Sequence, residues 1–310
     1  MFSAMAIASA TRYAVIETKD LVETHRLIDQ DRDAEVVVAP VRGGMVTRFR
    51  VGGDDILYLD TGTLRDHNQN VRGGIPVLFP IAGRLTDDAF LLDGQRIALP
   101  QHGFARKVPW RITATEADDD VAAIALALEH SEATLAIWPF RFRLVFRYEL
   151  RDAVLTIHQR FENLGDRPMP IHPGLHPYFR VDQWRRRDAR VATRATRAFD
   201  NTVGVIRTLD GPIEFGSGEV DLHLLDHGKA EVVLDRPGAT SVRLAYDDAA
   251  IVVTLWTLPA RDFLCVEPWT RQSDALNRGE ALVLPPGGIH TWVVGISSQP
   301  RVVDTGTPAP

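Results

Sequence analysis

Cysteine is almost absent from this 310-residue chain, since Cys265 is the only one. A disulfide within the chain is therefore impossible, which excludes a small secreted fold stapled by disulfides. The sequence also lacks any run of about 20 apolar residues, the length that a membrane-spanning helix needs. Its opening, MFSAMAIASATRY, has neither the basic start nor the long apolar stretch of a secretory leader. We therefore expect a cytoplasmic protein that does not enter a membrane.

Positive charge is scarcer than negative charge, and the formal net charge is −6. This balance argues against nucleic acid as a partner, because nucleic-acid binding favours a basic face. The arginine-rich stretch at 184–197 is accordingly interpreted as a connection or a solvated edge. The Gly-Gly pair in VRGGIPVLFPIAGRL (71–85) lacks the spacing, the lysine and the hydroxyl residue of a phosphate-binding loop. An enzyme or a binding protein is the default, and no feature indicates an oligomeric state.

Long helical periods with capping residues are nearly absent as well. A candidate helix covers residues 21–31, and the LAIW run at 135–138 is interpreted as part of a strand. Short alternating or β-branched runs recur instead, separated by turn signals such as VGGDD (51–55) and LPPGG (284–288). Ten of these runs are predicted to be strands: 35–40, 45–51, 123–130, 142–150, 154–163, 230–235, 241–247, 250–258, 263–268 and 290–297.

Many strands joined by short turns, without alternating helices, are typical of an antiparallel sandwich or barrel. Residues 142–163 are predicted to form a hairpin, with two strands around the polar turn RDA. No linker, composition shift or internal repeat divides the chain. We therefore expect an all-β fold, a large antiparallel β-sandwich, in one domain that covers residues 1–310. The polar, proline-containing tail at 298–310 is expected to fray.

The stretch HPGLHPYF (172–179) interrupts this pattern with two histidines, each followed by proline. Histidine handles protons or metals near neutral pH, whereas each proline removes a hydrogen bond from a strand ladder. If the backbone is extended, His172 and His176 lie on the same face because the side-chain period is two. The stretch is therefore either a stiff structural corner or the wall of a site.

Three further residues are candidates for chemistry. In FLCVEPWT (263–270), an apolar strand delivers Glu267, which is either a solvent-facing strand end or a carboxylate in an aromatic pocket with a raised pKa. His102 precedes a glycine that lets the backbone approach a ligand, although a loop histidine is commonly a surface residue. Arg84 follows a glycine in a loop that either crosses the sheet or reaches a site. Individually these signals are ambiguous.

Together the candidates fit two kinds of chemistry. A metal-dependent enzyme of the cupin type would use histidine and glutamate ligands, drawn from His102, His172, His176 and Glu267. The His-x-x-x-His spacing works as a ligand pair on a helix, however, and the prolines forbid a helix there. Metal-free acid–base catalysis needs a proton donor and a proton acceptor around a small polar substrate. A sugar-binding protein without catalysis remains a third interpretation.

Three segments carry a family resemblance: GRLTDDAFLLDGQRIALPQHGFA (83–105), GLHPYF (174–179) and VEPW (266–269). In these segments the sequence resembles the aldose 1-epimerase, or mutarotase, superfamily, whose members share a large antiparallel β-sandwich. The motifs fall in the family's order, and the match spans roughly residues 40–295. The sequences of the segments GGIPVLFP and HGFAR are more similar to the branch that includes hexose-6-phosphate epimerases.

The resemblance implies an isomerase that interconverts the α and β anomers of a sugar by opening and closing its ring, with no cofactor and no metal. It places the catalytic acid at His176 and the catalytic base at Glu267. Four further residues are expected to contact the sugar: Arg84, His102, Asp226 and Trp269. Phe104 and Tyr178 are expected to pack against the sugar's apolar face.

The sequence departs from the galactose mutarotase pattern at two positions. Gly83 stands where that pattern has an asparagine, so one sugar contact is expected to be missing. The aspartate that holds sugar hydroxyls has two candidates, of which Asp226 is preferred to Asp221. His172 is interpreted as a structural neighbour of the site. Whether the sugar carries a phosphate is left open, and the candidate phosphate contacts are Arg48, Arg72 and Arg106.

Overall fold

The computed structural model describes residues 11–228 and 230–300. Within these ranges, three large antiparallel sheets and two short strand pairs make up most of the regular structure. The predicted antiparallel β-sandwich is therefore confirmed. The expected loose tail at 298–310 falls mostly outside the described residues, but Ser298 and Gln299 are paired with Val242 and Ser241 and do not fray.

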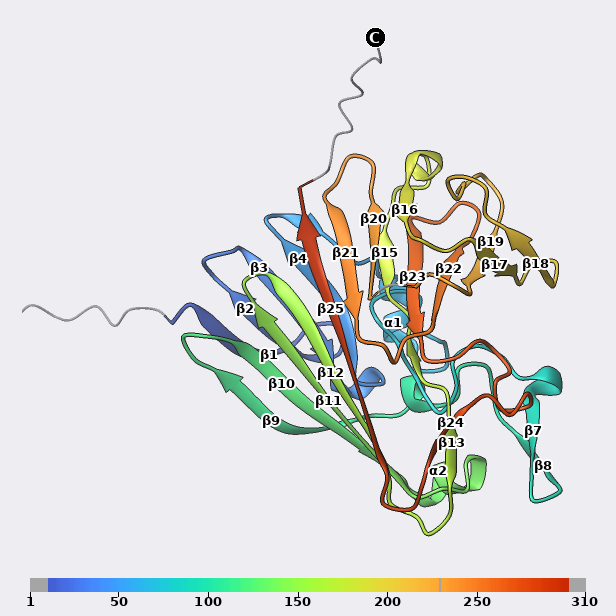
Figure 1. Ribbon diagram of the computed structural model, residues 1–310. Coiled ribbons are helices and arrows are strands. Elements are labelled where there is room, and N and C mark those ends of the chain that lie inside the picture. The colour runs from blue at the N-terminus through green and yellow to red at the C-terminus, as the bar shows by residue number, and fades with distance from the viewer. Residues whose placement is uncertain (1–10, 229, 301–310) are drawn as a thin grey trace, which may run out of the picture.

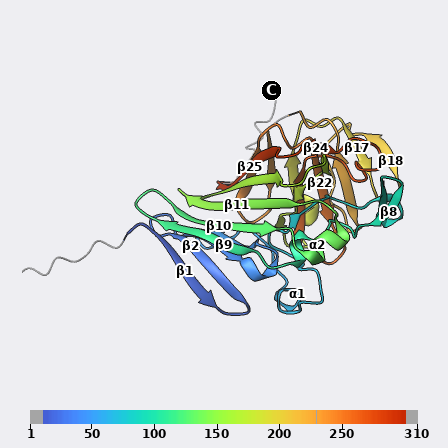
Figure 2. The ribbon, with the colours of Figure 1, turned by 90° about the horizontal axis from the view of Figure 1, so that it is seen from below.

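The first sheet consists of consecutive strands in the order β1-β2-β3-β4-β5. Its members are β1 (Tyr13–Lys19), β2 (Glu23–Asp29), β3 (Ala34–Ala39), β4 (Met45–Val51) and β5 (Asp54–Asp55). β1 and β2 pack against β9, β10 and β11 of the second sheet, as Figure 2 shows from below.

The second sheet has the order β16-β20-β21-β25-β12-β11-β10-β9 and fans out across the left and centre of Figure 1. Its members are β9 (Arg111–Ala117), β10 (Ala122–Glu129), β11 (Phe142–Arg151), β12 (Val154–Asn163), β16 (Arg190–Ala192), β20 (Glu231–Asp235), β21 (Ser241–Tyr246) and β25 (Ile289–Gln299). The predicted hairpin is β11–β12, whose register runs from Arg151 and Val154 to Phe142 and Asn163.

The third sheet has the order β18-β17-β19-β22-β23-β14-β6, and β15 pairs with β23 beside β14. Its members are β6 (Val77–Leu78), β14 (Gly174–Leu175), β15 (Tyr178–Arg180), β17 (Arg197–Asp200), β18 (Val205–Thr208), β19 (Val220–Leu224), β22 (Val252–Thr257) and β23 (Phe263–Trp269). This sheet stands at the right of Figure 1.

Short elements connect the sheets. The strand pairs are β7 (Ala89–Leu92) with β8 (Gln95–Ala98), and β13 (Met169–Ile171) with β24 (Leu282–Leu284). The helical segments are α1 (Thr61–Arg65), α2 (Glu132–Ile137) and the 3₁₀ turns η1 (Pro40–Arg42), η2 (Thr86–Asp88), η3 (Ala105–Lys107) and η4 (Arg186–Asp188). In the part of the chain that the structure describes, no helix has the length and apolarity to cross a membrane.

Two sequence predictions are wrong at this level. Residues 21–31 contain the strand β2, because pairing with β1 and β3 overrides a local pattern compatible with a helix. The run at 135–138 is instead part of α2 and its C-terminal cap. Ser131 caps the N-terminus of that helix in a capping box. Its side chain accepts a hydrogen bond from the Thr134 backbone N–H, and the Thr134 side chain accepts one from the Ser131 backbone N–H.

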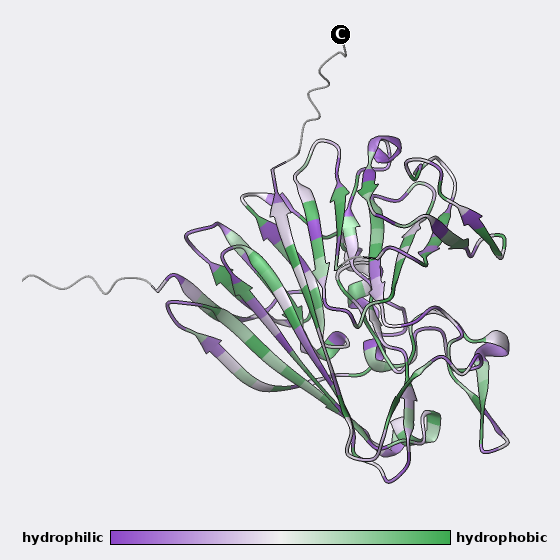
Figure 3. Cartoon of the chain, viewed as in Figure 1, coloured by the Kyte–Doolittle hydropathy of each residue, from purple (hydrophilic) through white to green (hydrophobic). Residues whose placement is uncertain are grey.

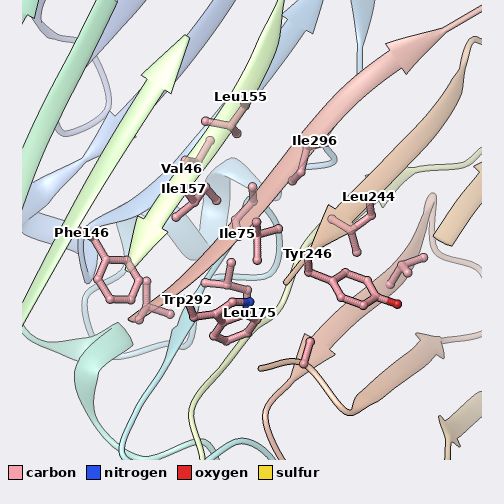
Figure 4. Close-up of a cluster of buried hydrophobic side chains, with 14 of the residues drawn as sticks. Val46, Ile75, Phe146, Leu155, Ile157, Leu175, Leu244, Tyr246, Trp292 and Ile296 are labelled. Atoms are coloured by element: carbon pink, nitrogen blue, oxygen red, sulfur yellow. The ribbon is translucent and has the colours of Figure 1, made fainter. Parts of the chain in front are cut away.

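The core lies between the sheets and follows from period-two alternation. β11 alternates strictly between buried and partly exposed residues over most of its length, and green and purple residues interleave along these strands in Figure 3. Figure 4 shows part of the buried cluster, in which the second sheet meets residues of β4, β14 and the loop before β6. The labelled members are Val46, Ile75, Phe146, Leu155, Ile157, Leu175, Leu244, Tyr246, Trp292 and Ile296.

Candidate active site

A cleft with a volume of about 980 Å³ opens over the third sheet. Side chains of β19, β22 and β23 line it from the sheet, together with residues of the HPGLHPYF segment. The loops at 70–72, 83–86, 101–106 and 272–278 complete its walls. The cleft therefore collects residues from segments that are far apart in the sequence.

Strand β23 delivers Glu267 to this cleft. All of its residues are buried; Leu264 and Val266 belong to the main core, whereas Glu267 and Trp269 face the cleft. Glu267 is only 1% exposed, and the indole Nε1–H of Trp269 donates a hydrogen bond to its Oε2 at 3.2 Å. The carboxyl group is thus held in place inside an aromatic wall.

The HPGLHPYF segment brings His176 to the opposite side of Glu267. Gly174 pairs with Trp269, and Tyr178 pairs with Cys265, so the residue between them comes to lie against Glu267. His176 Nδ1 lies 3.3 Å from Glu267 Oε1, without the alignment of a hydrogen bond. The break between β14 and β15 coincides with Pro177, the second proline of the motif.

Neighbouring groups fix the His176 ring. Its backbone N–H donates to the carbonyl of Pro76 at 3.1 Å, and its ring stacks on Tyr178 with centroids 4.6 Å apart and planes 7° apart. The ring of Trp256 lies edge-on at 5.7 Å. The HPGLHPYF segment is therefore a wall of the site, and it holds the His176 imidazole rigidly beside the Glu267 carboxyl group.

Burial pushes the two pKa values of this pair in opposite directions. Desolvation raises the pKa of Glu267 well above its usual value, and the charge of Asp221 adds to the rise. Desolvation lowers the pKa of His176 well below its usual value, and the positive charge of Arg106 adds to the fall. Both effects favour uncharged forms, a carboxylic acid next to a neutral imidazole.

His102 contributes a hydrogen-bond donor of fixed tautomer. Its Nδ1 accepts a hydrogen bond from the backbone N–H of Gly83 at 2.9 Å, which leaves the proton on Nε2. Its ring lies 5.4 Å from that of His176 and 5.9 Å from that of Trp269. Burial lowers the pKa of His102 well below its usual value, so the ring stays neutral at neutral pH.

The glycines around His102 are required by the backbone. Gly103 has φ of 64°, and a Cβ there would lie 2.1 Å from the carbonyl oxygen of Phe79. Gly83 has φ of 83°, and a Cβ there would lie 2.1 Å from Ser273 Oγ. An asparagine at position 83 therefore does not fit beside Ser273, which explains the departure seen in the sequence.

Arg84 lines the cleft at its outer edge. Its side chain is 66% exposed and forms an ion pair with Asp88 at 3.2 Å. Arg84 is thus available to a ligand at the cleft mouth and is separate from the buried pair.

The structure places Asp221 in the cleft and Asp226, the preferred candidate, outside it. Asp226 is not among the residues that line the cleft; its carboxylate accepts hydrogen bonds from the Thr196 hydroxyl and from the backbone N–H groups of Thr196 and Arg197. These bonds lower its pKa to about 2. Asp221 lines the cleft instead, where Asn201 donates to its Oδ2 at 2.7 Å.

Two other expectations need correction or refinement. Phe104 is a core residue that packs on Phe79 and Phe142, and it does not line the cleft. Tyr178 does line it. His172 is fully buried behind the cleft, where its backbone pairs with Pro80 and Ala82.

The metal-ligand set of the alternative, cupin-type interpretation is not assembled among the described residues. Among the residues that the structure describes, the one group of His, Cys, Asp and Glu ligand atoms close enough to hold an ion consists of His176, Cys265 and Glu267. His102 and His172 do not join it.

The cleft also holds residues that the sequence did not single out. His223 of β19 is buried, with Nε2 3.4 Å from Asp221 Oδ1, and its ring lies 5.2 Å from that of Trp269. Trp256 and Asn201 line the cleft as well. The alternation in EVDLHLL could have placed Asp221 and His223 on one face, but no motif marked that face as the site.

Two arginines in the cleft have no carboxylate partner among the described residues. Arg106 is partly buried, which lowers its pKa to about 10, and its Nη2 donates to the carbonyl of Gln101 at 3.0 Å. The guanidinium of Arg72 lies 5.4 Å from the centre of the Trp256 ring. Arg48, the third candidate, pairs with Asp55 outside the cleft.

Comparisons with known proteins agree with this geometry. The family model described as aldose 1-epimerase matches residues 26–297. A curated relative from Salmonella typhimurium, named "Putative glucose-6-phosphate 1-epimerase", is 30% identical over 178 residues, which are 54% of this chain and 54% of that protein. The matched segment spans about half the length of that relative.

Solved structures share the whole architecture. The Slr1438 protein from Synechocystis sp. PCC 6803 has a TM-score of 0.87 and 35% identity, over 93% of this chain and 100% of that chain. A galactose mutarotase-like protein from Clostridium acetobutylicum has a TM-score of 0.76 and 16% identity, over 94% and 99%, and so shares the fold. Since the family model matches most of its length, the chain belongs to the aldose 1-epimerase family.

Proposed function

We propose that the protein interconverts the α and β anomers of a hexose 6-phosphate by acid–base opening and closing of the sugar ring. The observation that carries this proposal is the buried pair of His176 and Glu267, 3.3 Å apart at the floor of the cleft. A pair of titratable groups with opposite pKa shifts at one site is the arrangement that proton transfer to and from a substrate needs.

In the proposed reaction, the Glu267 carboxylate takes the proton of the C1 hydroxyl while protonated His176 gives its proton to the ring oxygen. The bond between C1 and the ring oxygen breaks, and an open-chain aldehyde forms. Rotation about the C1–C2 bond and the reverse transfers then give the other anomer. No electrons are exchanged, and the two protons moved in the first half return in the second.

Burial favours the protonation state of the pair that accompanies the open chain. That state is a neutral carboxylic acid beside a neutral imidazole, and the raised pKa of Glu267 and the lowered pKa of His176 both stabilise it. The reverse transfers during ring closure, from Glu267 to the C1 oxygen and from the C5 hydroxyl to His176, regenerate the carboxylate and imidazolium that start a turnover. Each acid or base contributes about 10²–10⁴-fold to the rate.

Other residues position the sugar in this scheme. The Nε2–H of His102 donates to an oxygen of the ring or its hydroxyls, and Asp221 accepts from hydroxyls in the role first given to Asp226. Trp269, with its indole already bonded to Glu267, offers an apolar face. Arg84 contacts the sugar from the mouth of the cleft.

A phosphate on the sugar is supported by the two unpaired arginines. Arg72 and Arg106 both line the cleft, and a guanidinium matches phosphate geometry with two parallel hydrogen bonds. Arg106 is partly buried and forms no ion pair with a carboxylate among the described residues, so a bound anion would compensate its charge. The name of the Salmonella relative indicates the same substrate class.

Anomer exchange followed by NMR tests both parts of the proposal. Freshly dissolved single anomers of free hexoses and hexose 6-phosphates are compared with wild-type protein and with Glu267→Gln. Acceleration of the 6-phosphates alone, lost in the variant, is the expected result. Equal acceleration of free hexoses contradicts the phosphate assignment. Binding of a sugar without any acceleration makes the protein a carbohydrate-binding module.

A further inference from the structure

The mechanism leaves one buried nucleophile beside the catalytic pair unused. Cys265 is on β23, two residues before Glu267, and therefore on the same face of the strand. It is fully buried and packs with Tyr178 and Phe263. It does not line the cleft, so it touches no substrate in the scheme above.

The ligand atoms of three residues converge at this point. A ring nitrogen of His176, the Sγ of Cys265 and a carboxylate oxygen of Glu267 all lie within 4.8 Å of one another. His176 Nδ1 is buried without a hydrogen-bond partner, and only 7% of its side chain is exposed. Trp269 holds the other carboxylate oxygen of Glu267, as an outer partner does around a metal ligand.

The spacing suits a tetrahedral ion. Zinc bonds of about 2.0–2.3 Å at tetrahedral angles put nitrogen and oxygen ligands about 3.3 Å apart, and sulfur about 3.6 Å from either. The Nδ1–Oε1 distance is 3.3 Å, so that edge is already formed. Closing the sulfur edges from at most 4.8 Å to about 3.6 Å requires a shift of at most about 1.2 Å, within the range of one side-chain adjustment.

We propose that His176, Cys265 and Glu267 form an inhibitory binding site for a thiophilic divalent cation of the zinc type. A thiolate and a carboxylate balance the charge of the ion, and a neutral imidazole completes a protein ligand set of three. The thiolate selects zinc-like ions over magnesium or calcium. The fourth position faces the cleft through His176 and Glu267, which line it.

Bound metal occupies both members of the catalytic pair. Their lone pairs are then no longer available to take or give the protons of the sugar, so the reaction stops while the metal stays. The inhibition rests on the function proposed above; the binding of the metal does not. The two are therefore measured separately.

Metal binding is tested on the purified, metal-free chain. Zn²⁺ is titrated by calorimetry, and Co²⁺ is used as a coloured substitute whose thiolate charge-transfer band in the near ultraviolet reports a cobalt–sulfur bond. The expected result is one ion per chain with that band, and about 100-fold weaker binding without the band in Cys265→Ser. His67→Gln, at an exposed histidine that does not line the cleft, is the control and keeps both.

Inhibition is read as the ratio of anomer-exchange rates with and without Zn²⁺ for each protein. We expect wild type and His67→Gln to be inhibited at stoichiometric Zn²⁺ and Cys265→Ser to resist at least about 10-fold more metal. Absence of the cobalt–sulfur band in the wild-type chain overturns the site without reference to any variant's folding. A band without inhibition of an active enzyme overturns the inhibitory role. A band in a protein that accelerates no sugar overturns the proposed function instead.

Discussion

At the scale of single residues, burial is the physical agent that turns ordinary side chains into a reactive pair. Glu267 and His176 are 1% and 6% exposed. In both, desolvation disfavours the charged form more than neighbouring groups favour it. Burying such a pair lowers the free energy of unfolding, since neither partner is a permanent counter-ion for the other. That cost is understandable if the pair exchanges protons with a substrate.

Replacement of His176 by asparagine should separate catalysis from binding. Asparagine keeps a polar group of similar reach but cannot deliver a proton, so kcat should fall about 10²–10⁴-fold while the affinity for the sugar changes little. Saturation kinetics from NMR exchange rates give the first number, and calorimetric binding gives the second. His172→Asn, the same exchange four residues earlier but behind the cleft, should lower stability and leave kcat nearly intact. Equal losses of turnover and affinity in the His176 variant would argue against its role as the acid.

Replacement of Glu267 by glutamine should make the protein more stable than wild type, by a margin that grows as pH rises. Because the folded pKa of Glu267 is raised, the folded state binds more protons, and the wild type loses stability as pH climbs from the unfolded value through the folded one. Glutamine does not titrate and still accepts the Trp269 hydrogen bond. The unfolding free energy of the variant should exceed that of wild type at about pH 8, and the gap should narrow toward about pH 4. Urea titrations at both values measure it; a gap that widens toward acid contradicts the sign.

At the scale of elements, strands with a clear period were predictable and those shaped by context were not. All ten predicted runs contain strands. The run at 154–163 shows the clearest alternation, with buried and less buried residues following one another along its length. β6 and β14 have two residues each, too short for a period, and exist only because they pair with one another and with β23. The same limit affected the site: Asp221 lies inside β19 and Asp226 lies just after it, and the sequence alone did not show which of the two faces the cleft.

One contact between elements makes a sharp stability test. Arg236 is 1% exposed at the end of β20 and donates to Asp54 Oδ2 at 2.6 Å, linking the second sheet to β5 of the first. Burial lowers the pKa of Arg236, so the Asp54 carboxylate is what keeps its charge acceptable there. Asp54→Ala should therefore cost about 3 kcal/mol of unfolding free energy.

The neighbouring aspartate is the control for that test. Asp55 pairs with Arg48 at 3.0 Å, but the two side chains are 38% and 47% exposed. Asp55→Ala should cost less than about 1 kcal/mol. Chemical denaturation of both variants gives the comparison, and similar losses would mean that the Arg236 contact is no stronger than a surface pair.

At the scale of the whole molecule, the net negative charge of the chain opposes the positive charge of two arginines in the cleft. The chain carries a formal charge of −6, which repels an anionic sugar phosphate at long range, whereas Arg72 and Arg106 present positive charge inside the cleft. Capture of a phosphorylated substrate therefore depends on the local field of the cleft, because like charges elsewhere are screened within about 10 Å at ordinary salt.

Arg72→Gln should reduce kcat/KM for a hexose 6-phosphate at least about 10-fold, and should leave any slow reaction with the free hexose unchanged. Loss of one charge contact should also flatten the decline of kcat/KM with rising salt. Arg48→Gln removes an arginine of equal charge that pairs with Asp55 outside the cleft, so it should keep the wild-type rate and the wild-type salt dependence. NMR exchange rates for both sugars over a range of salt concentrations provide the measurement. If the two variants behave alike, the effect belongs to the net charge of the molecule, and Arg72 is not a phosphate contact.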